Sequence, residues 1–229
     1  GQGRQLADRL FGRWQIARGG SEERHRVGHS PLSEPNALNY KLGYAMDKLV
    51  LIFGLLCYLT MGAVVRRHFA SATTPPVTRL SIIASYGGIA AFVYLTLRDP
   101  HAVAARVAAL AIFATSLTLF LWAAKTTRSE RLRLAFDPGS PGSVVRTGPY
   151  RYIRHPFYTS YILFWFGCMI ATLHPVMLLF LVAFSAMNVT AAYREERSFE
   201  TSPLTEEYAK YRKTAGMLWP KLGTAEPQL

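Results

Sequence analysis

Residues 157–193 read FYTSYILFWFGCMIATLHPVMLLFLVAFSAMNVTAAY and contain no Asp, Glu, Lys or Arg. A helix that crosses a bilayer needs roughly 20 consecutive, mostly apolar residues, so this stretch is long enough for two crossings. Proline removes a backbone donor and disfavours helix at the residue before it, and His174-Pro175 lies near the middle of the stretch. We therefore predict a helical hairpin made of Phe157–Leu173 and Pro175–Ala192.

Three further uncharged runs precede the hairpin, at 49–65, 80–97 and 107–124, and each has the length of one crossing. Hydrophobic residues make up 50% of the chain and charged residues 17%, whereas about 25% of residues are charged in an average soluble domain. A soluble protein of this size would have to bury all four runs in one core. The sequence therefore predicts an all-α, polytopic membrane helix bundle with about five transmembrane helices.

This pattern divides the chain into three parts. Residues 1–44 form a basic N-terminal segment, partly an amphipathic helix (6–16) and partly a polar linker (17–40). Residues 45–124 hold three transmembrane helices. Residues 125–229 hold a long basic loop, the transmembrane hairpin and a C-terminal tail.

The formal net charge of +12 follows the membrane topology. Lys and Arg gather in the cytoplasmic loops of membrane proteins, and here they are dense in 125–156 and in the tail after Tyr193. We therefore predict that both segments are cytoplasmic and that nucleic acid is not a partner. The excess of Arg over Lys and the compact loops favour a bacterial inner membrane.

The basic segment 1–44 does not fit this rule directly, because five crossings place it on the opposite side of the membrane. A long tail can escape the rule, or residues 6–16 can lie on the membrane surface. Cys57 and Cys168 both fall inside predicted membrane helices, and the histidines show no metal-ligand spacing. We therefore predict neither a disulfide nor a metal site. The sequence specifies no oligomeric state.

The stretch GSVVRTGPYRYIRHPFYTSY, residues 142–161, joins the basic loop to the hairpin. Pro156 suits the first turn of a helix, and the free N–H groups of that turn attract a carboxylate or phosphate. Two arginines add positive charge, and tyrosine faces can hold a cation; these residues are Arg151, Arg154, Tyr150, Tyr152, Tyr158 and Tyr161. The residues predict either a site for a zwitterionic or anionic ligand or an interfacial Arg/Tyr belt that anchors the helix.

The segment TGPYRYIRHPFY resembles the Arg-His-Pro-x-Tyr motif of the isoprenylcysteine carboxyl methyltransferase and phospholipid methyltransferase superfamily. In that family the motif precedes a hydrophobic hairpin, a glutamate pair and a Glu-Glu-Tyr-x-x-Tyr tail. The same order is found here: Arg154-His155-Pro156-Phe157-Tyr158, the hairpin, Glu195-Glu196, then Glu206-Glu207-Tyr208 with Tyr211. The resemblance covers roughly Gly142–Pro220.

The resemblance implies an enzyme that transfers a methyl group from S-adenosylmethionine to a lipophilic small molecule or lipid-modified acceptor in the membrane. It implies that the loop, the hairpin and the tail bind this cofactor. The implied cofactor-binding residues are Gly142, Ser143, Val144, Val145, Tyr150, His155, Pro156, Phe157, Tyr158, Glu195 and Glu196. Glu196 and Arg194 are the candidate catalytic residues. A carboxylate or thiol is favoured over an amine as acceptor, because an amine has to lose a proton and the motif region offers no clear base.

Two positions depart from the family pattern. Ser160 stands where glycine is frequent, and Ala192 stands where isoprenylcysteine enzymes carry an arginine near the acceptor. Arg194 is the nearest basic residue, but an offset of two residues directs it to another side of a helix. These departures leave open a non-catalytic membrane scaffold or subunit that keeps the fold. A membrane reductase is a third hypothesis, because sterol reductases share a related C-terminal region.

Overall fold

The computed structural model of the chain describes residues 34–68, 76–98, 102–128 and 144–221. Its elements are helices, in the order α2 (Glu34–His68), α3 (Pro76–Arg98), α4 (Val103–Thr126), the 3-10 turn η1 (Gly148–Arg151), α5 (Pro156–Thr172), α6 (Pro175–Glu200) and α7 (Thr205–Thr214). The predicted all-α class is confirmed. The predicted amphipathic helix at 6–16 and two predicted cofactor contacts, Gly142 and Ser143, lie outside the described residues.

Among the described residues, four helices are long and apolar enough to cross a membrane, whereas we expected about five crossings. The four spans are Lys41–Arg67, Thr78–Arg98, Val103–Thr126 and Pro175–Glu200. The remaining predicted crossing is α5, which has 17 residues and is therefore about 25 Å long at 1.5 Å per residue. A bilayer core is about 30 Å thick, so α5 by itself is short for a full crossing.

The turn between α5 and α6 is made by two residues before a proline. Leu173 ends α5 in a left-handed conformation, with φ 46°. His174 then caps α6, because its Nδ1 atom accepts a hydrogen bond of 3.2 Å from the N–H of Val176. Pro175 occupies the first turn of α6, where its missing N–H costs no helical hydrogen bond. Helix α6 continues to Glu200, eight residues beyond the predicted end of the hydrophobic segment, and so carries the glutamate pair on a rigid element.

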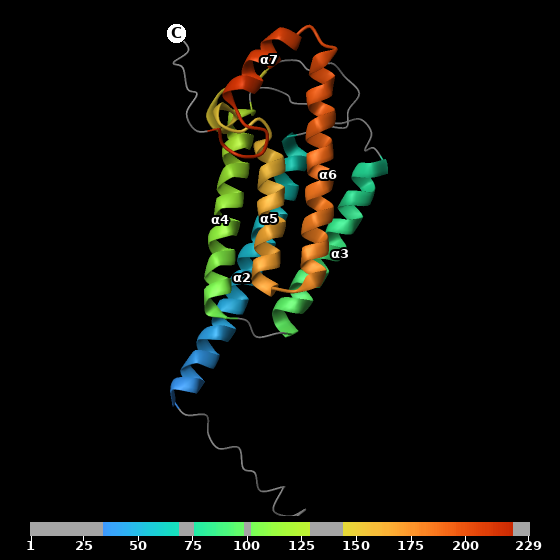
Figure 1. Cartoon of the computed structure of the whole chain (residues 1–229). Helices are drawn as coiled ribbons and strands as arrows, with labels where there is room; N and C mark the ends of the chain where they lie inside the picture. The colour runs from blue at the N-terminus through green and yellow to red at the C-terminus, as the bar shows by residue number, and fades with distance from the viewer. Residues whose placement is uncertain (1–33, 69–75, 99–101, 129–143, 222–229) are drawn as a thin grey trace, which may run out of the picture. The chain divides into compact units, whose positions relative to one another are not determined.

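Helices α4, α5 and α6 lie side by side, with η1 and α7 at one end (Figure 1). The approach of α4 to α5 is close at Gly167, where an added Cβ would lie 2.7 Å from the ring of Phe113. The buried hydroxyl of Ser116 also donates to the carbonyl oxygen of Ser160 over 2.7 Å. Ser160, the departure from the family's glycine, is thus a fully buried polar residue of this helix interface.

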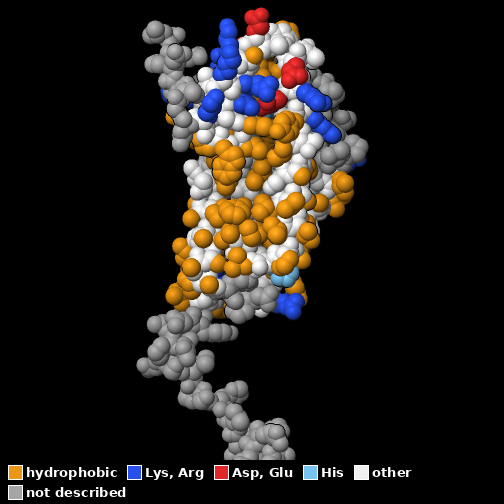
Figure 2. Space-filling view, in the orientation of Figure 1, with side chains coloured by type: hydrophobic (Ala, Val, Ile, Leu, Met, Phe, Trp, Pro, Cys, Tyr) orange, Lys and Arg blue, Asp and Glu red, His pale blue; other side chains and the backbone are white. Residues whose placement is uncertain are grey.

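The surface separates into an apolar and a charged zone. In Figure 2 an apolar band covers the middle of the visible face, and most charged side chains gather at the end where η1 and α7 lie. That distribution matches a bundle whose middle contacts lipid and whose one end contacts water. We call this charged end, formed by residues 144–155 and 201–221 with the adjoining ends of α5 and α6, the polar cap.

A buried ion pair lies near the other end of α4. Arg106, in the second turn of α4, donates to Asp47 of α2. The side chains are 3% and 15% exposed. The pair joins two helices that are distant in sequence and fixes their relative register.

Candidate functional site

The start of α5 is held by the C-terminal tail. The N–H of Arg154 donates to the carbonyl of Gly216 (2.8 Å) and that of His155 to the carbonyl of Met217 (3.1 Å). The N–H of Gly216 donates back to the carbonyl of Tyr152 over 3.0 Å. These bonds form a short parallel bridge beside Pro156, which opens the helix. The tail therefore fixes the backbone on which the histidine of the motif is mounted.

Glu196 is the centre of the polar cap. Its Oε1 atom accepts from Arg154 Nε over 2.8 Å and lies 3.2 Å from His155 Nε2. Its Oε2 atom lies 3.5 Å from Arg212 Nε. The residue is only 5% exposed. A buried carboxylate requires such partners, so Glu196 is largely committed to orienting Arg154 and His155.

Glu195 has fewer partners than Glu196 and is more exposed to solvent. It accepts a hydrogen bond of 3.2 Å from the hydroxyl of Tyr158, and its Oε2 atom lies 3.6 Å from His155 Nδ1. Its side chain is 39% exposed, and among the described residues no arginine is paired with it. The rings of His155 and Tyr158 stack at 5.5 Å. The two adjacent glutamates thus have different surroundings, and Glu195 is the one with capacity for a further cation.

Arg154 ties the motif to the tail. Besides Glu196, its guanidinium donates to the carbonyl oxygens of Arg212 and Ala215. Its side chain is 9% exposed. The positive charge next to the first turn of α5 is thus held in place on three sides, and together with the helix N-terminus it favours an anion there.

An aromatic cluster supports the tail from the other side. Tyr211 donates to the carbonyl of Tyr150 over 2.6 Å, and the rings of Phe199 and Tyr208 stack at 4.0 Å. Val144, a predicted cofactor contact, packs against this cluster. Burial raises the pKa of both Tyr208 and Tyr211 above the ordinary tyrosine value, so both remain hydroxyl donors at neutral pH. The buried Tyr208 hydroxyl lies near the guanidinium of Arg154 but makes no well-formed hydrogen bond among the described residues.

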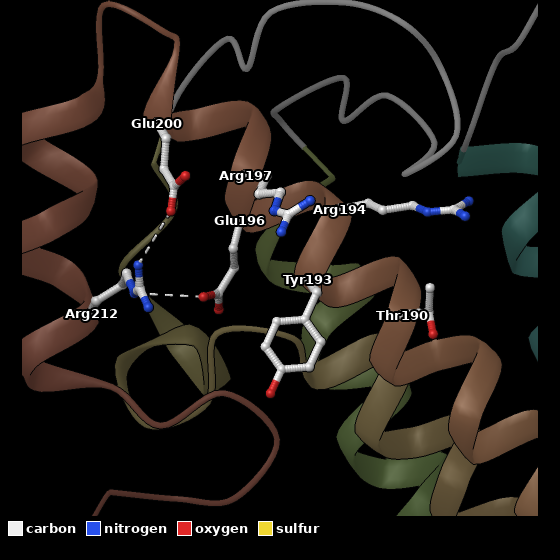
Figure 3. A pocket seen from close by; sticks show the side chains of 7 residues that line it. All are labelled: Thr190, Tyr193, Arg194, Glu196, Arg197, Glu200 and Arg212. Atoms are coloured by element: carbon white, nitrogen blue, oxygen red, sulfur yellow. Dashed lines mark ion pairs between the residues drawn. The ribbon is translucent and has the colours of Figure 1, made fainter.

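A groove opens along α6 beside Glu196 (Figure 3). Its volume is about 350 Å³, and it is lined by Thr190, Tyr193, Arg194, Glu196, Arg197, Glu200 and Arg212. Arg212 points toward Glu196 and Glu200, whereas Arg194, which also lines the groove, extends away from both glutamates. In the described part of the chain, Arg194 and Arg197 form no ion pair. The groove therefore has two parts. Its glutamates are already paired with Arg212, whereas Arg194 and Arg197 are available to a ligand.

The structure brings together most of the predicted residues that it describes. Tyr150, His155, Pro156, Tyr158, Glu195 and Glu196 all lie in the polar cap, with Val144 and Val145 leading into it. Phe157 differs, because its ring packs edge-on against Phe120 of α4 at 5.2 Å, in the core of the bundle. Arg194 lines the same groove as Glu196 but does not pair with it. Ala192 is 0% exposed, so no arginine fits at that position without displacing the packing.

Three residues of the site were not assigned from the sequence. Arg154 is noted from the sequence for its charge and as the first residue of the motif, but no contact is assigned to it. Arg212 is not singled out, and Tyr208 is quoted only as part of the tail motif. The spacing of Tyr208, Tyr211 and Arg212 on one short helix was the available signal, since residues three and four apart share a helix face. Which element that face contacts depends on how the tail folds back.

Comparisons with known proteins place the site in a family. Residues 104–208 match the family model described as phospholipid methyltransferase. No curated protein matches the chain in a sequence search. The matched segment runs from the start of α4 to α7, and so includes the motif, the helix pair and the glutamates. The resemblance to membrane methyltransferases is thereby confirmed for residues 104–208, which match the phospholipid methyltransferase family model, in a chain whose apolar helices indicate an integral membrane protein.

Proposed function

We propose that the polar cap binds S-adenosylmethionine and that the protein transfers its methyl group to a lipophilic acceptor that carries an anionic group. The observation that carries the proposal is the convergence of His155, Tyr158, Glu195 and Glu196 at the start of α5. Beside them lies a groove with two arginines that form no ion pair within the described residues. When bound, S-adenosylmethionine supplies an electrophilic methyl group on a sulfonium centre.

The chemistry of the cap fits a zwitterionic ligand with an additional cationic centre. Glu195, which is partly exposed and has no arginine partner in the part of the chain that the structure describes, can pair with an ammonium group. The first turn of α5 and Arg154 can accept a carboxylate, and the stacked faces of His155 and Tyr158 can take a sulfonium. The buried Tyr208 hydroxyl makes no well-formed hydrogen bond among the described residues, so it is a polar atom that a ligand could satisfy.

The groove along α6 suits an acceptor that arrives from the bilayer. Thr190 and Tyr193 also line it, and Tyr193 is 59% exposed. Arg194 and Arg197 can hold a carboxylate, a thiolate or the phosphate of a lipid headgroup. A carboxylate or thiolate acceptor needs no general base, whereas an amine does. Glu196 is engaged by Arg154 and His155, and Glu195 is the proposed partner of the cofactor's ammonium group, so neither serves as that base. The acceptor is therefore a carboxylate or thiol in preference to an amine.

In this arrangement the residues act mainly by positioning. Glu196 holds Arg154 and His155 in place, and the tail carbonyls hold the backbone of both residues. Holding two reactants in line can lower a barrier by several kcal/mol, about 7–11 in favourable cases.

The positive-inside rule supports a cytoplasmic position for the basic cap, and we assign the protein to a bacterial inner membrane.

Calorimetric titration of the detergent-solubilised full chain with S-adenosylmethionine tests the cofactor assignment. Glu195→Gln should weaken binding by about tenfold to a hundredfold, because a hydrogen bond to a charged group is worth about 1.5–3 kcal/mol. Glu200→Gln is the matched control, because the 61% exposed side chain of Glu200 forms an ion pair only with Arg212 among the described residues, at 3.9 Å. The cofactor affinity of this variant should be unchanged. Folded wild-type protein that takes up no cofactor would overturn the proposal and favour the scaffold hypothesis.

The acceptor is then identified with methyl-labelled cofactor and membrane lipid extracts. Mild alkali releases label from a methyl ester but not from a thioether or an N-methyl group, so base-labile label identifies a carboxylate acceptor. Base-stable label in a sulfur-containing product identifies a thiol. Label in a methylated amine headgroup would contradict the predicted acceptor class while leaving the cofactor site intact.

A further inference from the structure

The end of the C-terminal tail forms a closed loop against the start of α5. The carbonyl of Tyr152 accepts from the N–H of Gly216 (3.0 Å) and from that of Lys221 (3.2 Å), which pinches residues 216–221 into a loop. At Gly216 an added Cβ would collide with the carbonyl oxygen of Trp219, so the loop closes only with glycine at this position. The backbone of this loop is therefore well fixed.

The loop lies at the level where α5 becomes apolar. The hydroxyl of Thr159, in the first turn of α5, donates to the carbonyl of Leu218 over 2.9 Å. From Pro156 to Thr172 the helix contains no charged residue. If α5 begins at the boundary between headgroups and hydrocarbon, Leu218 and its neighbours lie at the same boundary.

Trp219 belongs to this fixed loop, and its side chain is largely exposed. It is 75% exposed, the highest value among the exposed large hydrophobic residues of the described chain, and it lies outside the membrane-spanning helices. Tryptophan is enriched at the membrane–water interface, where its ring sits among headgroups. Lys213 and Lys221 are exposed nearby, joined by a hydrogen bond from Lys221 Nζ to the Lys213 carbonyl, and basic residues close to the surface are attracted to anionic lipids.

We propose that the loop 216–221 is a membrane anchor, with Trp219 inserted in the headgroup layer and the flanking lysines on anionic phospholipid. The consequence concerns the polar cap, because the same loop supplies the carbonyl oxygens that bind the N–H groups of Arg154 and His155. Contact with the bilayer thus holds the tail closed on the motif. The inference does not depend on methyl transfer and holds for any activity of the cap.

Fluorescence quenching in vesicles tests the anchor directly. The full chain is reconstituted in phosphatidylcholine and phosphatidylglycerol whose acyl chains carry bromine either near the headgroup or near the chain end. The signal of Trp219 is obtained as the difference between wild type and Trp219→Phe, a change that its exposure makes structurally mild. We expect stronger quenching by the shallow bromine than by the deep one, and a blue-shifted emission.

Quenching of this difference signal by aqueous iodide but by neither lipid would place Trp219 in water and overturn the proposal. Stronger quenching by the deep bromine, or quenching by none of the three, would also overturn it. The difference between wild type and Trp122→Phe is the internal control, because Trp122 lies on α4 and is 45% exposed. Its quenching by brominated lipid shows that the bundle is inserted.

Hydrogen exchange of the Arg154 and His155 amides measures the proposed link to the cap. In vesicles, Trp219→Ser should speed their exchange severalfold relative to wild type, whereas Trp219→Tyr, which keeps an interfacial aromatic side chain, should not. In detergent without anionic lipid the difference between the two variants should shrink. Identical exchange in all variants, in vesicles, would contradict the link.

Discussion

Two buried arginine–carboxylate pairs lie near opposite ends of α4, and their surroundings differ. Arg106 and Asp47 join α4 to α2 and, within the described residues, form ion pairs only with each other. Arg154 and Glu196 form the centre of a network that also includes His155, Arg212 and two tail carbonyls, next to an open groove.

The difference separates a structural contact from a candidate site. In the Arg106–Asp47 pair each charge has one partner, which is enough to fix helix register. In the polar cap, Glu195 and the buried Tyr208 hydroxyl retain capacity for a further partner, and Arg194 and Arg197 form no ion pair within the described chain. Buried polar groups normally have partners. Polar groups beside a groove that can still form a hydrogen bond or an ion pair therefore indicate a ligand site, whereas burial of a charge alone does not.

Glu196→Gln should produce the largest effect of the changes considered. It leaves the guanidinium of Arg154, 9% exposed, without a full counter-charge, and breaking a buried pair costs about 3–5 kcal/mol. We expect a strong loss of S-adenosylmethionine binding by calorimetry, as for His155→Ala, together with faster hydrogen exchange in 212–217. Near-normal affinity in both variants would remove the two residues from the site and favour a purely structural network.

Asp47→Ala should separate stability from binding. The lone buried Arg106 should lower the free energy of unfolding by about 3 kcal/mol, seen as a lower thermal midpoint in detergent. The folded fraction should keep its cofactor affinity, because the pair lies far along α4 from the cap. Replacing both partners, in Asp47→Ala with Arg106→Met, should recover much of the stability. A parallel loss of affinity in the single variant would mean that the two ends of the bundle are coupled.

The smallest expected effects are those of replacing two tyrosines of the polar cap, Tyr208 and Tyr211, by phenylalanine. Tyr211→Phe removes a 2.6 Å hydrogen bond to the carbonyl of Tyr150 and should cost about 1 kcal/mol of stability. Tyr208→Phe removes a hydroxyl that lies near Arg154 but makes no well-formed hydrogen bond among the described residues, so stability should change less than in Tyr211→Phe, while cofactor affinity falls. Thermal unfolding and calorimetry on both variants measure the two quantities. Equal stability losses would show that Tyr208 is already engaged in the unliganded protein.

Sequence patterning was sufficient for the helical class and for the residues that carry the motif. The uncharged runs identify membrane helices because an apolar segment of that length has few other stable environments. The proline at 175 predicts the break between α5 and α6, which lies where expected. The predicted number of crossings differs from the four spans found among the described residues, because α5 is short. Whether α5 crosses the membrane depends on the helices beside it.

The contacts of the polar cap could not be read from the sequence. Arg154 donates hydrogen bonds to carbonyl oxygens of the tail about 60 residues later in the chain. No local sequence pattern predicts such a long-range contact. The different roles of the two glutamates also escape sequence reasoning. On one helix, adjacent residues face different directions, and only the packing of the tail shows that Glu196 is enclosed and Glu195 remains accessible.

The sequence by itself determined that the chain is a membrane helix bundle with a methyltransferase motif, because hydrophobic length and local motif order are properties of contiguous residues. The tertiary structure decided which charges are used and which remain available, because that depends on burial and on partners brought in from distant segments. The position of Trp219 is the clearest case: one exposed tryptophan carries little information in a sequence, but on a closed loop beside the first turn of α5 it marks a surface for the membrane.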